Sequence, residues 1–310
     1  MRRGTVSVLF TVILLLAAGC SQGSKTPTFA SGSGKVNVVA SFYPVFEFAR
    51  AVGGDKADVV SLIPAGVEPH DWEPSPKDMK MLNAAGLFVY NGAGLEHWVP
   101  KTLASLDNKR LVAVETAKGL DLMNGGPEEK GEAEALDPHV WLDPAYAIRQ
   151  VEAIRDGFIQ VDAANKDVYT QNAGAYIKQL TALDQEYQTG LTRCPRKDFF
   201  TAHAAFGYLA RQYGVTQHPI MGLSPDAEPT PLAMAKVAAS AKELGIKYIF
   251  FETLVSDKLA RTLAQEVGAK ALPLNPIEGL ADSEVKAGKS YLSVMRENLG
   301  NLRLALECGK

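Results

Sequence analysis

Short apolar runs alternate with longer segments of helical periodicity along most of the chain. Strands that alternate with helices are typical of parallel sheets whose two faces are covered by helices. The pattern therefore predicts an α/β fold built as two parallel-sheet lobes, one in each half of the chain. The predicted strands are residues 36–40, 59–63, 87–90 and 111–114 in the first half, and 199–202, 248–251 and 271–274 in the second. The predicted helices between them are residues 45–52, 76–85, 233–244 and 257–267.

The most regular periodicity lies between these two sets. Its apolar residues step alternately by four and three positions, so they share one face of a helix. They are Tyr169, Ala173, Tyr176, Leu180, Leu183 and Tyr187. Asn165 is a helix-start signal, and the pattern ends near Gly190. We interpret the segment as a long rigid helix that joins the lobes, with domain limits of 36–160, 161–192 for the linker helix, and 193–310.

The first residues of the chain predict export. Arg2 and Arg3 precede an apolar, uncharged run over residues 6–18, which ends just before Cys20. A charged start, a short apolar run and small residues describe a secretory signal peptide, and the run is shorter than the ~20 residues that span a bilayer. The sequence AAGC at 17–20 resembles a bacterial lipobox. We therefore expect a signal peptide over residues 1–20 that ends at a lipidated Cys20.

An ordinary signal peptide with an incidental cysteine is the alternative to this lipid anchor. Residues 21–35 are rich in Ser, Gly and Thr and lack an apolar stripe, so we expect a flexible tether. The protein is then held outside the cytoplasmic membrane by lipid on Cys20.

Charge and cysteine content narrow the function. The chain has 35 acidic and 32 basic residues and no basic stripe, whereas nucleic-acid binding needs clustered positive charge. We therefore expect no nucleic-acid partner. Beyond Cys20 the chain has only Cys194 and Cys308. An even pair in an exported protein predicts a disulfide, and two thiols are too few for a cysteine-based zinc cluster.

Three of the five histidines occur where α/β folds place ligands, after a strand or in a loop bounded by turn residues. His70 follows the predicted strand 59–63, His203 follows 199–202, and His139 lies between two Asp-Pro turns. Neutral imidazole is the commonest side-chain ligand for zinc-like ions, and three imidazoles with one carboxylate complete a tetrahedron. The sequence therefore predicts a Zn²⁺ site. His97 and His218 occupy a helix start and a loop and are not assigned to it.

The fourth ligand should be a carboxylate from the second lobe. Glu278 follows the last predicted strand and is favoured, while Glu252, directly after strand 248–251, is the competitor. Asp137 or Asp143 is suited to accept the second N–H group of a ligand histidine, as outer carboxylates commonly do.

Five segments carry a resemblance to a known family. They are SFYP at 41–44, PHDWEP at 69–74, DPHVWLDP at 137–144, TAHAAFGY at 201–208 and LNPIEGL at 274–280. In this order they resemble the metal-binding solute-binding lipoproteins of bacterial ABC transporters (cluster A-I type), in their zinc branch.

The resemblance implies two lobes bridged by one long helix, Zn²⁺ in the cleft between them, and delivery to a transporter permease in the membrane. It implies no enzymatic activity, and we expect a monomer. The implied metal ligands are His70, His139, His203 and Glu278.

The chain departs from the family pattern at two places. Asn275 stands where many relatives have Asp, so the chain resembles the subgroup in which the following Glu binds. Zinc-branch members often carry a His-rich loop at residues 125–135, but here this segment holds four glutamates and no histidine. We interpret it as a solvated acidic loop, and a role in gathering ions is the alternative.

Three other functions stay open at this point. They are binding of manganese or another divalent metal by a protein of the same type, a zinc-dependent hydrolase, and a surface adhesin.

Overall fold

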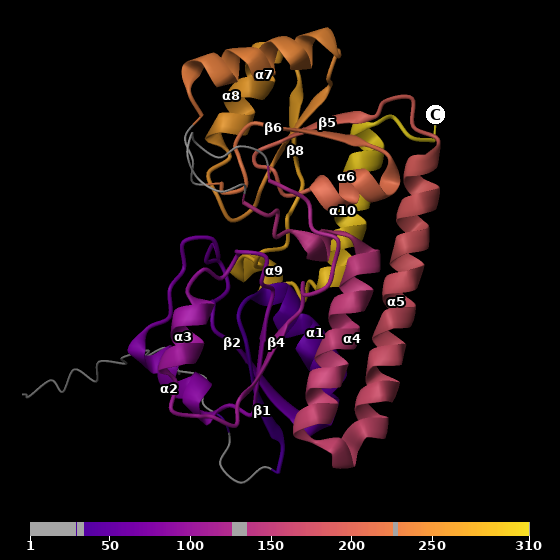
Figure 1. Ribbon diagram of the computed structural model, residues 1–310. Helices are drawn as coiled ribbons and strands as arrows, with labels where there is room; N and C mark the ends of the chain where they lie inside the picture. The colour runs from indigo at the N-terminus through magenta and orange to yellow at the C-terminus, as the bar shows by residue number, and fades with distance from the viewer. Residues whose placement is uncertain (1–28, 30–33, 126–134, 226–228, 310) are drawn as a thin grey trace, which may run out of the picture.

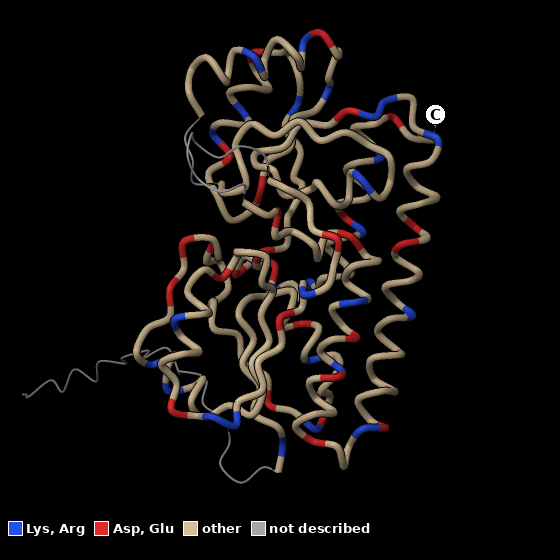
Figure 2. The backbone as a smooth tube through the Cα atoms, in the orientation of Figure 1, with Lys and Arg blue, Asp and Glu red and all other residues tan. Residues whose placement is uncertain are grey.

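The computed structural model describes residues 29, 34–125, 135–225 and 229–309. The signal peptide, Cys20, nearly all of the tether and most of the acidic segment 125–135 lie outside the described residues. The described chain forms two lobes, one above the other, along whose common side the long helix α5 runs (Figure 1). Acidic and basic residues are interspersed over both lobes (Figure 2).

The N-terminal lobe has a four-stranded parallel sheet in the order β2-β1-β3-β4. The central strands β1 and β3 are rich in Val, Leu and Phe and are largely buried, as parallel strands covered on both faces must be. The strands are β1 (Val36–Ala40), β2 (Ala57–Ser61), β3 (Leu87–Tyr90) and β4 (Val112–Glu115).

Helices cover both faces of this sheet. Two begin at a proline and the other two have one at the second position, which suits the first helical turn because the missing N–H would have no partner there. The Ser75 and Asp143 side chains accept a hydrogen bond from the first turns of α2 and α4. The helices are α1 (Tyr43–Gly53), α2 (Pro76–Ala84), α3 (Val99–Ser105) and α4 (Pro144–Val161), with 3₁₀ turns at Gly54–Lys56 and Val140–Leu142.

The C-terminal lobe repeats the same topology, with the parallel strand order β6-β5-β7-β8. Its strands are β5 (Asp198–Thr201), β6 (Thr216–Pro219), β7 (Tyr248–Phe251) and β8 (Lys270–Pro273). Its helices are α6 (Gly207–Tyr213), α7 (Pro231–Glu243), α8 (Lys258–Val267), α9 (Asp282–Lys286) and α10 (Tyr291–Ala305).

The interpretation of His218 as a loop residue is wrong, because it lies in strand β6. This strand has the sequence TQHP, is partly exposed and forms one edge of the sheet. An edge strand tolerates proline and needs no continuous apolar run, so it lacks the pattern that reveals a buried strand.

Helix α5 (Lys166–Thr192) contacts both lobes. Its 27 residues correspond to about 40 Å of helix. Tyr169, Ala173 and Tyr176 are buried against the N-terminal lobe, and the Tyr187 hydroxyl donates to the Met295 carbonyl of α10 at 2.7 Å. A 3₁₀ turn at Ala163–Asn165 separates α5 from α4, which packs beside it (Figure 1).

Helix α10 also spans the junction. At its N-terminal end, Tyr291 packs against Phe48 of α1 with ring centroids 4.9 Å apart, and its hydroxyl donates to the Trp141 carbonyl. Just beyond its C-terminal end, Cys308 forms a disulfide with Cys194, which follows α5. The disulfide thus joins the ends of the two helices that connect the lobes.

The predicted fold class, two parallel-sheet lobes with helices on their faces and one long linking helix, is confirmed by this topology. The limits 36–160, 161–192 and 193–310 stay a proposal for the domain division. No helix among the described residues is long and apolar enough to cross a membrane.

Candidate metal site

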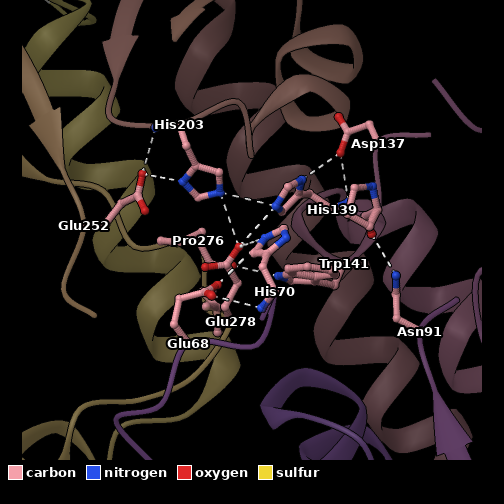
Figure 3. Close-up of polar contacts among 12 residues, drawn as sticks. Glu68, His70, Asn91, Asp137, His139, Trp141, His203, Glu252, Pro276 and Glu278 are labelled. Atoms are coloured by element: carbon pink, nitrogen blue, oxygen red, sulfur yellow. Dashed lines mark hydrogen bonds and ion pairs between the residues drawn. The ribbon is translucent and has the colours of Figure 1, made fainter. Parts of the chain in front are cut away.

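Four side chains from the two lobes converge at the carboxyl ends of both sheets (Figure 3). One ligand atom of each lies within 4.8 Å of the corresponding atoms of the other three. We call this set the ligand cluster. Its members are His70, His139, His203 and Glu278.

The topology explains why residues so far apart in sequence meet. His70 follows β2, and His139 lies in the connection from β4 to α4. His203 follows β5 by two residues, and Glu278 follows β8. Because the carboxyl ends of parallel strands lie at one edge of each sheet, and the two edges face each other, both lobes contribute to one site.

The spacing within the ligand cluster suits a tetrahedral ion. A Zn²⁺ ion with bonds of about 2.0–2.1 Å holds its ligand atoms about 3.3 Å apart. Glu278 Oε1 lies 3.2 Å from Nε2 of His70, 3.1 Å from Nε2 of His139 and 3.3 Å from Nε2 of His203. The His139 and His203 Nε2 atoms are 3.3 Å apart. Four of the six separations among the donor atoms are therefore those that such an ion requires, and the other two, from His70 to the other histidines, are within 4.8 Å.

Two carboxylates orient the buried histidines from behind. Asp137 Oδ1 accepts from the His139 Nδ1–H at 2.8 Å, and Glu252 Oε1 accepts from the His203 Nδ1–H at 2.7 Å. The backbone N–H of each histidine donates to the same oxygen. Because Nδ1 donates to these carboxylates, Nε2 of each ring faces the cluster and offers its lone pair to an ion once its proton has left (Figure 3).

This arrangement separates the two candidate carboxylates. Glu278 contributes an oxygen to the ligand cluster, whereas Glu252 lies behind His203 and contacts Nδ1. Of the two aspartates suited to accept the second N–H of a ligand histidine, Asp137 does so for His139. Asp143 instead caps α4, where it accepts from the Ala145 N–H at 2.8 Å.

A strained turn presents Glu278. Ile277 has φ 59°, a region that β-branched residues rarely adopt. The Asn275 side chain accepts from the Ile277 N–H at 2.7 Å, and Asn298 pairs with the Asn275 backbone. Asn275, which departs from the family pattern, therefore shapes the turn instead of joining the cluster. The Trp141 indole also donates to the Pro276 carbonyl at 2.7 Å and so ties the turn to the first lobe.

Burial and charge act in opposite directions on these groups. Burial raises the pKa of Glu278, but the charge of His203 and hydrogen bonds from the three histidines outweigh it and hold this pKa well below its usual range. Burial lowers the pKa of His203, yet the charges of Glu252 and Glu278 hold it well above its usual value. The pKa of His139 is also raised, because hydrogen bonds to Asp137 and Glu278 outweigh burial.

The two histidines that the sequence did not assign to the site lie outside the ligand cluster. His97 is exposed and 3.6 Å from Glu73, while His218 contacts Asp198 at 2.8 Å and stacks on Phe200. Trp141 packs against His139 with ring centroids 5.2 Å apart, whereas Trp72 packs against Trp98.

Sequence reasoning missed two residues that hold the ligand loops. Glu68 Oε2 accepts from the His70 N–H at 2.9 Å. Asn91, directly after β3, donates from its side chain to the Pro138 carbonyl at 2.9 Å, beside His139. A glutamate two residues before a predicted ligand is a local signal for Glu68. Asn91 carries no such signal, because its contact bridges 47 residues.

Two α/β lobes linked by a long helix, with histidines and a carboxylate between them, define a metal-binding protein of the two-lobed solute-binding class. The sequence profile of zinc-uptake complex component A, periplasmic (ZnuA), matches residues 38–305. The chain belongs to this family, and its resemblance to the zinc branch is confirmed.

Curated relatives agree with this assignment. The high-affinity zinc uptake system protein ZnuA of Bacillus subtilis is 44% identical over 94% of this chain and 94% of its own length. The zinc-binding lipoprotein AdcA of Streptococcus pneumoniae is 42% identical over 96% of this chain, which spans 60% of AdcA.

Solved structures give the same fold. The Zn(II)-bound ZnuA-like domain of Streptococcus pneumoniae AdcA is 44% identical, with a TM-score of 0.79 over 88% of this chain and 100% of that domain. The laminin-binding protein Lmb of Streptococcus agalactiae, described as bifunctional with adhesin and metal transporting activity, is 34% identical. Its TM-score is 0.78 over 87% of this chain and 99% of its own.

Proposed function

We propose that this protein captures Zn²⁺ outside the cytoplasmic membrane in the ligand cluster and delivers it to the permease of an ABC transporter. The observation that carries the proposal is the convergence of three imidazole nitrogens and one carboxylate oxygen within 4.8 Å of one another, with four of the six separations at 3.1–3.3 Å. Zinc is here the cargo, and the protein holds it between its lobes.

The donor set favours zinc over manganese. Imidazole suits Zn²⁺, whereas Mn²⁺ prefers carboxylate and water oxygens, and raw affinity for a nitrogen-rich site rises towards the later metals. The cluster offers three imidazoles to one carboxylate. The names of the relatives, a zinc uptake protein and a zinc-binding lipoprotein, support the same cargo.

The cluster also favours capture over hydrolysis. A catalytic zinc site keeps one position open for water, whereas four protein donors here suffice for a tetrahedral ion. We propose that the ion enters and leaves the cluster past His70. The side chain of His70 is 11% exposed and lines a cleft of about 490 Å³, whereas those of His139 and His203 are 0% exposed.

The location and the partner follow from the N-terminus and the family. We propose that lipid on Cys20 anchors the monomeric protein to the outer face of the membrane, where a permease can receive the ion. The family is named as a component of a zinc-uptake complex, and a binding component needs a membrane partner to deliver its cargo.

Metal analysis of protein purified without an affinity tag or added metal tests the cargo, and His203→Ala tests the site. His203→Ala should lose most zinc affinity, because His203 is one of two cluster members from the second lobe. His218→Ala is the matched control, because His218 also contacts a carboxylate, Asp198, but lies outside the cluster. Equal zinc binding by the two variants would contradict the proposed site, and manganese in place of zinc would contradict the cargo.

Surface adhesion is a second candidate, favoured by the similarity to the laminin-binding Lmb. Immobilised laminin is the probe. Saturable binding that persists in His203→Ala protein would support a separate adhesive surface, and absence of binding would remove this candidate.

A further inference from the structure

The arm that carries His139 begins as a two-stranded ribbon. Asn124 and Leu136 form an antiparallel bridge, and the Gly125 N–H donates to the Ala135 carbonyl at 2.7 Å. One pair closer to the site, the Asp137 N–H donates to the Met123 carbonyl at 2.8 Å. Asp137 is two residues before His139, so this last pair of the ribbon fixes where the ligand arm starts.

A side chain from the other lobe completes this pair. In an antiparallel ladder, a hydrogen-bonded pair of residues exchanges two N–H···O bonds. Here the return bond runs through Tyr208 of α6. The Met123 N–H donates to the Tyr208 hydroxyl at 2.9 Å, and that hydroxyl donates to the Asp137 carbonyl at 2.7 Å.

Tyr208 reaches this position by insertion into the first lobe. It is 0% exposed and forms a small apolar cluster with Ala93, Ala117 and Val140, all of the N-terminal lobe. The hydroxyl therefore exchanges no bonds with bulk water, and its two partners are both in the ribbon.

The preceding residue also packs against Asp137. A side-chain carbon at Gly207 would lie 2.9 Å from Asp137 Oδ2, so a larger residue there would displace this carboxylate or α6. Asp137 Oδ1 meanwhile accepts from both the backbone and the ring N–H of His139. Two consecutive residues of the second lobe thus contact the carboxylate residue that orients a ligand of the first.

We propose that Tyr208 is a positioning residue of the metal site, which places Asp137, and through it the His139 ring, by closing the Met123–Asp137 pair. The Tyr208 hydroxyl contacts no ligand atom and acts through the Met123–Asp137 pair. This inference rests on the proposed function, because it concerns how well the ligand cluster holds Zn²⁺. By this contact the second lobe, which supplies His203 and Glu278, also helps to place His139 of the first lobe.

The first test is Tyr208→Phe, which removes the hydroxyl and keeps the ring. We expect the Kd for Zn²⁺, measured by competition with a chromophoric chelator, to rise about tenfold, the low end of the effect of outer-shell changes. Tyr169→Phe is the control, since Tyr169 is also buried and its hydroxyl also donates a hydrogen bond of 2.7 Å, to the Asp162 carboxylate far from the site. The thermal midpoint of each metal-free variant gives its stability separately.

Two further measurements separate positioning from stability. In a double-mutant cycle with Asp137→Asn, the two losses of zinc affinity should not multiply, because Tyr208 acts through Asp137. Gly207→Ala should weaken zinc binding by displacing Asp137, whereas Gly174→Ala, where nothing lies within 4 Å of the added carbon, should not.

The outcomes distinguish the role of Tyr208 from the proposed capture of Zn²⁺. A parent protein that does not bind Zn²⁺ overturns both. A parent that binds Zn²⁺, with Tyr208→Phe equal to Tyr169→Phe, overturns only the role of Tyr208. Losses that multiply fully in the cycle also overturn it, because Tyr208 would then act independently of Asp137.

Discussion

Glu278→Gln removes one negative charge from the ligand cluster while preserving the size of the side chain. In the structure, Glu278 Oε1 lies 3.1–3.3 Å from three imidazole nitrogens, and the residue is 2% exposed. Glutamine still offers a carbonyl oxygen at this position, so the variant tests the anionic charge more than the shape.

The magnitude follows from the burial of the site. Removing one partner of a buried charge pair costs about 3–5 kcal/mol, and this cost corresponds to a loss of about 150-fold to 5,000-fold in affinity. Glu252→Gln changes a carboxylate that accepts from the ring Nδ1–H and the backbone N–H of His203 and is not part of the ligand cluster. Such outer partners typically contribute about 10–100-fold, so the loss for Glu278→Gln should exceed the loss for Glu252→Gln.

Competition with a fluorescent zinc chelator measures both variants, and metal-free thermal midpoints show whether each is folded. If Glu252→Gln loses more affinity than Glu278→Gln, the wrong carboxylate has been assigned as the ligand. If Glu278→Gln binds like the parent, the ion has three protein ligands and an open position, and the hydrolase interpretation must be tested.

Three further predictions concern pH, the disulfide and the anchor. Because the pKa values of His139 and His203 are raised, protons compete with the ion, and zinc affinity should fall from about pH 8 to about pH 6. The same protons stabilise the metal-free fold below about pH 6.5, and this stability is lost as pH rises through the folded-state pKa values. The increase in thermal midpoint on adding zinc should therefore be smaller at low pH, and an equal or larger increase there contradicts the assignment. Replacing Cys194 and Cys308 by serine should lower the free energy of unfolding by about 2–5 kcal/mol, and unchanged denaturant curves would show that the disulfide contributes little. Cys20→Ser should release the protein from membranes or leave it unprocessed, and normal processing with retained lipid label would refute the anchor.

Local periodicity was enough to predict the lobes and the linking helix. Buried parallel strands such as β1 and β3 need continuous apolar runs, and α5 needs an apolar stripe, so both are visible in the sequence. Strand β6 was missed because an edge strand can be polar. The extent of α10 across the junction was missed as well, because burial of Tyr291 against Phe48 depends on where the lobes meet.

The candidate ligands could also be predicted, because α/β folds bind ligands at the carboxyl ends of their strands and these ends can be located in the sequence. The sequence favoured Glu278 over Glu252 without excluding Glu252, since both follow strands of the same lobe. Only the tertiary structure shows that one lies in front of His203 and the other behind it. The contact of Tyr208 with Asp137 bridges 71 residues and two lobes. Such a contact leaves no local pattern, because its geometry is set by how the two sheets face each other and not by the residues beside it.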